Sequence, residues 1–195
     1  PQQIRYIFLT HAHDDHAGYL NEVLSECPDL QIVMSDKALE RLYRGQNSFH
    51  GGCTTKIALF FCYLMKFVGK GKHLFPSIKQ EYQCRCIQVT EQNRKQVELL
   101  LQGKIIDTPG HTADSISLLL NDGSLFCGDA AMNGLPSLHR ITIWAEDKTA
   151  FLKSWETIIA LRPNLIYPGH GKPFKDEDLK INLKRAKNME LLSIQ

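Results

Sequence analysis

Five ionisable side chains, three imidazoles and two carboxylates, lie close together near the start of the chain, in the stretch His11-Ala-His13-Asp-Asp15-His16. They follow Ile4–Leu9, an apolar run that predicts a buried strand. Imidazole nitrogen and carboxylate oxygen are the ligands that zinc, iron and manganese take in proteins. Side chains alternate along a strand, so His11 and His13 can share one ion while Asp15 and His16, beyond the bend, reach a second. The alternative is an ordinary strand-to-helix turn capped by Asp15.

Three further stretches supply ligands of the same types at the ends of predicted strands. His111 lies in Thr-Pro-Gly-His-Thr, Asp129 in Phe-Cys-Gly-Asp, and His170 in Tyr-Pro-Gly-His-Gly. Each ligand has a neighbouring glycine, which allows the backbone to bend tightly near a metal. Each stretch is a weak signal alone, but together with the first they predict a metal centre.

These four motifs, in this order, closely resemble the metallo-β-lactamase-fold hydrolase superfamily, from Ile4 to about Phe174. The resemblance implies an α/β fold, a four-layer αβ/βα sandwich, with two divalent metal ions. Zinc is the first expectation, and iron and manganese are the alternatives. The resemblance assigns the first ion to His11, His13 and His111, the second to Asp15, His16 and His170, and a bridging position to Asp129. Asp15 and Asp129 are the expected catalytic carboxylates.

The function that this resemblance implies is hydrolysis by a hydroxide bound between two metals, without a Ser or Cys nucleophile. The expected substrate is a small molecule with an ester-like bond, such as a thioester, a lactone or another acyl compound. One alternative is a phosphodiesterase or nuclease of the same fold. Another is an iron-dependent oxidoreductase such as a persulfide dioxygenase-like enzyme; relatives that reduce oxygen with two irons usually carry Glu in place of His13. A non-catalytic binding module is disfavoured because no ligand is missing.

Composition indicates an ordinary globular protein of 195 residues, with 43% hydrophobic and 23% charged residues. A net charge of +2 gives no argument for nucleic acid or for a membrane surface as a partner. The six cysteines are scattered, which favours free thiols in a reducing compartment, and we expect a cytoplasmic protein. No stretch is long and apolar enough to span a membrane.

Periodicity and turn residues predict alternating strands and helices, which is typical of an α/β fold. A helix is expected over 15–26, a second over 36–44 after an N-cap at Ser35, a third over 148–161 after Asp147, and a fourth over 176–192. Strands are expected at 31–34, 84–89, 104–107 and 165–167, and a hairpin over 115–128 around Asn-Asp-Gly-Ser. The segment 92–102 fits either a strand or a helix.

Residues 46–83 are the least readable part and are expected to be an insertion or lid segment. Within them, 56–68 is strongly apolar and lacks proline, which favours a helix. Two interpretations stay open for this helix: a member of the core, or a lid over the substrate.

Several polar residues near the motifs are given their ordinary interpretation. His50, His73 and His139 are expected at the surface, with His139 the best functional candidate of the three. Asp114 is interpreted as an exposed loop charge rather than a carboxylate that orients His111 or another ligand. Tyr167 is interpreted as a strand-packing residue rather than a donor to a developing oxyanion.

The chain is expected to be a single domain, 1–195, that lacks its N-terminal strands. Members of the superfamily usually carry several strands before the first motif, whereas only Pro1–Leu9 precede it here. Ile4–Leu9 should therefore pair with a strand from a missing segment, from another copy in an oligomer, or from a partner.

Overall fold

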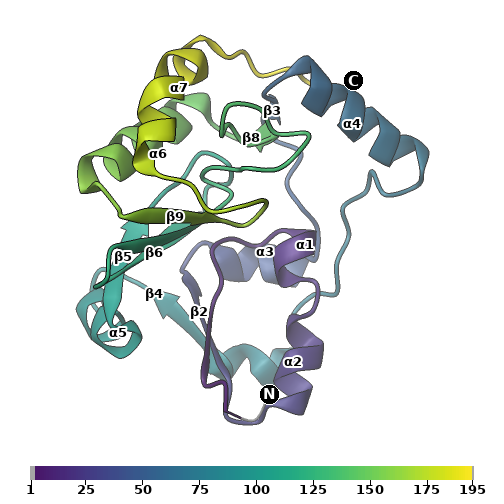
Figure 1. Ribbon diagram of the computed structural model, residues 1–195. Helices are drawn as coiled ribbons and strands as arrows, with labels where there is room; N and C mark the ends of the chain where they lie inside the picture. Colours follow the sequence, from purple (N-terminus) through teal and green to yellow (C-terminus); the bar gives the residue numbers. More distant parts are fainter. Residues whose placement is uncertain (1–2, 195) are drawn as a thin grey trace.

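The computed structural model describes residues 3–194 and contains two main β-sheets with helices on their outer faces (Figure 1). The first sheet has the parallel order β1 (Tyr6–Phe8), β2 (Gln31–Ser35), β4 (Cys86–Val89). The second has the order β5 (Gly103–Asp107), β6 (Ile116–Leu120), β7 (Ser124–Gly128), β9 (Leu165–Pro168). Two short strands, β3 (Gly52–Cys53) and β8 (Trp144–Ala145), pair separately.

The helices divide into a group for each sheet and a few connecting elements. The first sheet carries α1 (Asp14–Ala17), α2 (Leu20–Glu26) and α3 (Ala38–Arg44). The second carries α6 (Lys148–Leu161) and α7 (Asp176–Asn188), which pack on each other. The 3-10 helix η1 (Gln80–Arg85) precedes β4, and α5 (Arg94–Leu101) lies between β4 and β5. The helix α4 (Lys56–Phe67) stands apart at the upper right of Figure 1.

Three apolar clusters separate these layers, as the period-two alternation of strands requires. On β2, Ile32 and Met34 pack against α2 and α3, while Val33 between them faces the other way. Val33 lies in a cluster shared with β4, β5, β6 and α5, which joins the two sheets. The third cluster packs α6 and α7 against the second sheet. This order of helices, sheet, sheet and helices is the predicted αβ/βα sandwich.

Most predicted elements are confirmed, with three local corrections. The helix expected over 15–26 is wrong as one piece, because it breaks at Gly18 into α1 and α2. Ser35 is not the N-cap of α3, whose cap residue is Lys37. The last helix ends at Asn188 rather than at 192, and the ambiguous segment is the helix α5. The Asp147 cap is confirmed: its carboxylate accepts the backbone N–H groups of Thr149 and Ala150.

The interpretation of 56–68 as a core helix is wrong, because most of its large side chains are exposed. Phe60 is 71% exposed and Phe67 is 88% exposed, and Ala58 is the buried residue of α4. Thr55 caps the helix by accepting the N–H of Ala58. The helical conformation of 56–67 is therefore stabilised by the Thr55 cap and by the local sequence rather than by burial of its large side chains.

The first strand, β1, lies at the edge of its sheet in the described residues. β1 is half-buried and pairs with β2, and the prediction that further strands lie beyond it stays a prediction.

None of the six cysteines, all of which lie in the described residues, forms a disulfide. Among residues 3–194, no helix has the length and apolarity needed to cross a membrane.

Replacing Trp155 should show how strongly the second sheet depends on its helical cover. Trp155 is fully buried, and its ring N–H donates to the carbonyl of Ala130 at 2.8 Å, one residue after Asp129. Trp155→Ala should lower the free energy of unfolding by about 3–5 kcal/mol through the cavity that it leaves. Trp155→Phe should cost less, about 1–3 kcal/mol, because chiefly the hydrogen bond is lost.

Urea unfolding measures these differences, and Leu99→Ala, at an 80% exposed position, is the control. The control should change the free energy of unfolding by less than about 0.5 kcal/mol. A Trp155→Ala protein as stable as this control would contradict the assignment of Trp155 to the core.

Candidate metal centre

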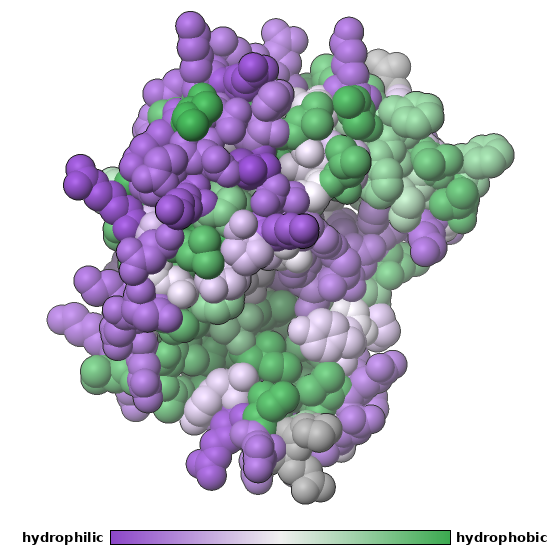
Figure 2. All heavy atoms as spheres, viewed as in Figure 1, coloured by the Kyte–Doolittle hydropathy of each residue, from purple (hydrophilic) through white to green (hydrophobic). Residues whose placement is uncertain are grey.

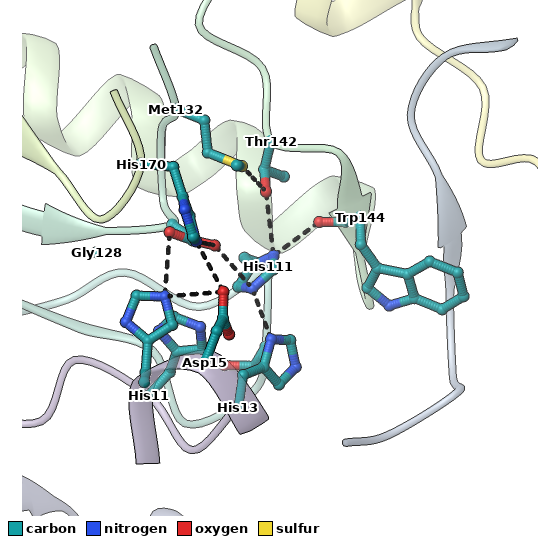
Figure 3. Close-up of polar contacts among 12 residues, drawn as sticks. His11, His13, Asp15, His111, Gly128, Met132, Thr142, Trp144 and His170 are labelled. Carbon is teal, nitrogen blue, oxygen red and sulfur yellow. Dashed lines mark hydrogen bonds and ion pairs between the residues drawn. The ribbon is translucent and has the colours of Figure 1, made fainter. Parts of the chain in front are cut away.

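The seven predicted ligands converge at one edge of the sandwich because of strand direction. β6 is antiparallel to β5 and to β7, and β7 is parallel to β9, so β5, β7 and β9 run in the same direction. Their carboxyl ends meet at one edge, and each is followed by a ligand: His111, Asp129 and His170, respectively. The loop after β1 and the helix α1 bring the other four, His11, His13, Asp15 and His16, to the same place (Figure 3).

The first group of ligands consists of three buried imidazoles, those of His11, His13 and His111. One nitrogen from each lies within 4.8 Å of the others, and the Nε2 of His111 is 3.1 Å from the Nδ1 of His13. Nitrogens bound to one tetrahedral zinc lie about 3.3 Å apart, which follows from bonds of about 2.0–2.1 Å. This group therefore has the composition and spacing of a single metal site.

The orientation of His111 is set by two contacts on its far side. Its Nδ1 is 2.8 Å from the backbone carbonyl of Trp144 and 3.1 Å from the hydroxyl of Thr142 (Figure 3). A carbonyl only accepts hydrogen bonds, so Nδ1 carries the proton and Nε2 presents a lone pair to the cluster.

The second group consists of Asp15, His16 and His170, on the more open side of the cluster. The Nε2 of His170 is 2.9 Å from a carboxylate oxygen of Asp15, and that of His16 is 3.8 Å from the same oxygen. The side chain of Asp15 is 48% exposed, whereas that of Asp129 is 6% exposed. The second group is therefore the part of the cluster that solvent reaches.

Asp129 lies between the two groups and contacts both. Its Oδ2 is 3.6 Å from the Nε2 of His111 and 3.5 Å from that of His170, and its Oδ1 is 3.6 Å from the Nε2 of His16. A Cβ atom at Gly169 would lie 2.5 Å from Asp129 Oδ1 and 2.7 Å from a ring carbon of His16. Only glycine leaves room for the β9 turn to pass this close, as the neighbouring glycine in the sequence predicted.

The donor set fits a cation. The Nε2 atoms of His11, His13 and His16 and the Oδ1 of Asp129 are buried, and none has a hydrogen-bond partner among the described residues. Buried polar atoms without partners are costly, and native structures satisfy nearly all of them. A divalent cation would satisfy imidazole nitrogens and carboxylate oxygens together, and Asp129 is placed to contact both groups.

The histidines of the two groups differ in their tendency to carry a proton. Burial lowers the pKa of His11 and His13 in the first group, whereas nearby carboxylates raise the pKa of His16 and His170 in the second. Burial, reinforced by the neighbouring imidazoles, holds the pKa of His11 and of His13 well below the ordinary value, so both are neutral. The hydrogen bond with Asp15 raises the pKa of His170 to about 8. Burial opposes a charge on His16, but the carboxylate of Asp129 raises its pKa overall. A cation that binds the second group must therefore displace protons.

A buried ion-pair network holds the loops that carry the first group. Arg41 of α3 donates to both carboxylate oxygens of Glu146, at 2.7 and 2.8 Å, and its Nε is 3.0 Å from Asp114. The other oxygen of Asp114 accepts the N–H of Ala12, between His11 and His13, at 2.8 Å. The interpretation of Asp114 as an exposed loop charge is therefore wrong, because Asp114 is 1% exposed. The alternative agrees with the contacts, since the carboxylate holds the loop of His11 and His13 rather than His111.

The middle of the first motif is also tied to both ends of the segment before η1. Asp14 and Asn47 exchange two hydrogen bonds, from Asp14 N–H at 2.9 Å and from Asn47 Nδ2 at 2.8 Å. The other carboxylate oxygen of Asp14 is 3.1 Å from His73 Nδ1. The segment that contains α4 thus leaves and rejoins the body beside the metal motif.

Other sequence interpretations near the site have mixed outcomes. His139 contacts Arg185 of α7 and not the ligand cluster, so the better candidate of the three remaining histidines is His73. Tyr167 stacks on Phe126 with ring centroids 4.9 Å apart, as expected for a strand-packing residue. Sequence reasoning missed five supporting residues: Arg41, Asn47, Thr142, Trp144 and Glu146. They lie in the helix α3, in the short strand β8 or in loops, and no local sequence pattern marks their contacts.

Comparison with known proteins gives a family and two similarities that each cover nearly the whole of this chain. The family described as the Metallo-beta-lactamase superfamily matches residues 1–170. The chain is 26% identical over 196 residues to a Beta-lactamase-like protein 2 homolog of Caenorhabditis elegans, covering 95% of this chain and 50% of that protein. It is 25% identical over 193 residues to a Hydroxyacylglutathione hydrolase of Nitrosococcus oceani, covering 96% of this chain and 56% of that protein. The chain thus spans about half the length of these relatives.

Solved structures show the same fold. An archaeal metallo-beta-lactamase superfamily protein of Sulfolobus tokodaii superposes with a TM-score of 0.59 at 20% identity, covering 97% of this chain and 70% of that one. The likeness supports the layer order described above.

Removing the carboxylate of Asp114 should weaken metal binding although Asp114 is not a ligand. Asp114→Ala leaves the N–H of Ala12 unsatisfied and Arg41 with one carboxylate partner, so the loop of His11 and His13 loses its anchor. Metal affinity should fall about 10- to 100-fold, as for other residues that orient ligands. Competition with a chromophoric chelator measures the affinity.

Asp122→Ala, in the exposed turn between β6 and β7, is the matched control. If Asp114→Ala bound metal as tightly as Asp122→Ala, the positioning role of Asp114 would be excluded.

Proposed function

The chain belongs to the metallo-β-lactamase superfamily, and on that basis we propose that it is a metal-dependent hydrolase of an ester-like bond in a small molecule. The observation that carries the proposal is the convergence of all seven ligands, which leaves buried nitrogen and oxygen atoms of the cluster without partners. His11, His13 and His111 would hold one ion, Asp15, His16 and His170 a second, and Asp129 would bridge them. When bound, divalent ions lower the pKa of a shared water and polarise the bond under attack.

The residues of this chain prepare the site in ways that the contacts explain. Burial keeps His11 and His13 neutral, so no proton competes at these nitrogens. The Trp144 carbonyl holds the proton of His111 on Nδ1, which keeps Nε2 available. Asp15, on the open side, accepts a hydrogen bond from His170 Nε2 and is more exposed than Asp129, the other carboxylate of the cluster. We therefore assign catalytic roles to Asp15 and Asp129.

The class of bond is the finer part of the proposal. A relative that matches most of this chain carries the name Hydroxyacylglutathione hydrolase, and an acyl-glutathione is a thioester. A thioester is therefore the first substrate class to test, followed by a lactone. Zinc is the first metal to test, because three of the ligands form an all-imidazole group.

A substrate panel tests the proposed function. The metal-loaded protein is offered an acyl-glutathione thioester, a lactone, a p-nitrophenyl ester and a phosphodiester, and oxygen uptake is followed with a persulfide. Turnover of one of the first three is the expected result. Activity only on the phosphodiester, or only oxygen uptake with the persulfide, would replace the proposal with one of the two alternatives.

The metal content should be two ions per chain. Elemental analysis of protein purified without chelators should find about two divalent ions, and His170→Ala should reduce this to about one, because it removes a ligand of the second group only. His139→Ala, which removes a histidine outside the cluster, should retain both. A single ion in the unchanged protein, with activity unaffected by His170→Ala, would contradict the assignment of two metal ions.

Asp129→Ala should be the most damaging change of a single ligand, because its carboxylate contacts both groups. Hydrolysis of the best substrate should fall by several orders of magnitude, since water activation and charge stabilisation are lost together. Steady-state kinetics measure the effect, with Asp122→Ala again as the control. Near-normal turnover with full metal content would contradict the bridging role of Asp129.

A further inference from the structure

The helix α4 presents a continuous apolar ridge to solvent. We call Ile57, Phe60, Leu64 and Phe67, with the adjoining Tyr63 and Val68, the α4 ridge. Each is at least 40% exposed. Positions 57, 60, 64 and 67 are three or four residues apart, so their side chains line one face of the helix over its whole length. Figure 2 shows this ridge as a hydrophobic projection at the upper right of the molecule, where Figure 1 places α4.

Positive charge surrounds the ridge. Between Glu40 and Glu81 the sequence contains no acidic residue. In the same interval, four exposed lysines lie on α4 or in the turn after it: Lys56, Lys66, Lys70 and Lys72. The net charge of +2 for the whole chain hides this local excess, and so the composition gave no argument for a charged partner. An apolar ridge with a cationic border calls for a partner that is apolar and anionic at once.

The shape of this surface selects among such partners. Figure 1 shows α4 held away from the sandwich by the chain segments on either side of it, and Figure 2 shows a convex corner rather than a groove. A peptide or an acidic helix is recognised in a groove that encloses its side chains. Pairing with α4 of a second copy would bring the lysines of both helices together, which electrostatic repulsion disfavours. A planar anionic surface needs no groove, and its negative charge attracts the lysines instead of repelling them.

We propose that the α4 ridge docks on an anionic lipid bilayer, with its aromatic side chains in the boundary between headgroups and acyl chains and its lysines at the lipid phosphates. Interfacial helices of this kind combine an apolar face that contains Phe and Leu with flanking lysines. The binding is peripheral, in keeping with the finding that no helix within residues 3–194 can cross a membrane.

The segment that carries the docking helix α4 is joined to the metal motif at both of its ends. The two ends of the segment that carries α4 meet at Asp14, through Asn47 and His73, between the ligands His13 and Asp15. The bound helix therefore connects to the metal motif through contacts already described. The docking surface does not depend on the reaction that the metal centre performs.

Co-sedimentation with lipid vesicles tests the proposal on the metal-loaded protein. One set of vesicles is pure phosphatidylcholine, and the other contains phosphatidylglycerol as well. The protein should sediment with the second set and remain in solution with the first. Phe60→Glu/Phe67→Glu should weaken this binding by about tenfold or more, because it places two carboxylates at the lipid boundary. Leu99→Glu/Ile181→Glu is the matched control, with the same charge change at exposed apolar positions of α5 and α7.

A second pair of variants separates the apolar and the ionic parts. Phe60→Ser/Phe67→Ser, without a change of charge, should also weaken binding. Lys56→Gln/Lys70→Gln/Lys72→Gln should weaken it by roughly tenfold or more and reduce its sensitivity to salt. Circular dichroism should be unchanged in all variants, since the altered side chains are exposed.

Four results would overturn the proposal. They are the absence of sedimentation with anionic vesicles, equal sedimentation with pure phosphatidylcholine, an equal loss of binding in the Leu99/Ile181 control, and a dimer in analytical ultracentrifugation that only the Phe60→Glu/Phe67→Glu variant disrupts. The last result would assign the ridge to a second copy of the chain instead.

Discussion

The cost of burying polar atoms without partners is the constraint on which this structure depends. The imidazoles of His11, His13 and His16 and the carboxylate of Asp129 come together where water is largely excluded, and they do not satisfy one another fully. Four groups of this kind in an apolar interior would each cost free energy if they stayed unpaired. A bound cation would remove that cost, so the same atoms that destabilise the metal-free fold would provide the affinity for metal.

That constraint explains why the ligands are carried by loops that the rest of the protein holds tightly. The strands supply position, since three of them end at the same edge of one sheet. Orientation comes from contacts outside the cluster: Arg41 joins the loops through Asp114 and Glu146, and the Trp144 carbonyl sets His111. Truncating one carboxylate in such a buried network leaves other charges uncompensated, and this is why the loops behave as one unit.

The segment that carries α4 follows a different principle. Its ends are fixed at Asp14 by polar contacts, whereas its outer face exposes the aromatic side chains of Phe60, Tyr63 and Phe67. A helix that packs so little against the sandwich is free to differ in sequence without disturbing the metal centre. Interactions with substrate or surroundings can therefore change at α4 while the ligand cluster and its supporting network stay the same.

The sequence alone was sufficient for the fold class, for most strands and helices, and for selecting seven side chains that the structure brings together in one cluster. Those conclusions depended on features that are local in the chain: hydrophobic period, turn residues, and ligand types close together or next to glycine. The break at Gly18, the burial of Asp114, the role of His73 and the exposure of α4 were decided only by the tertiary structure. Asp114 is buried because Arg41, 73 positions away in the chain, lies opposite it, and His73 has its role because Asp14, 59 positions away, lies opposite it. An aspartate in a loop looks the same in sequence whether it faces water or a buried guanidinium, because the difference in free energy arises from the partner and its burial.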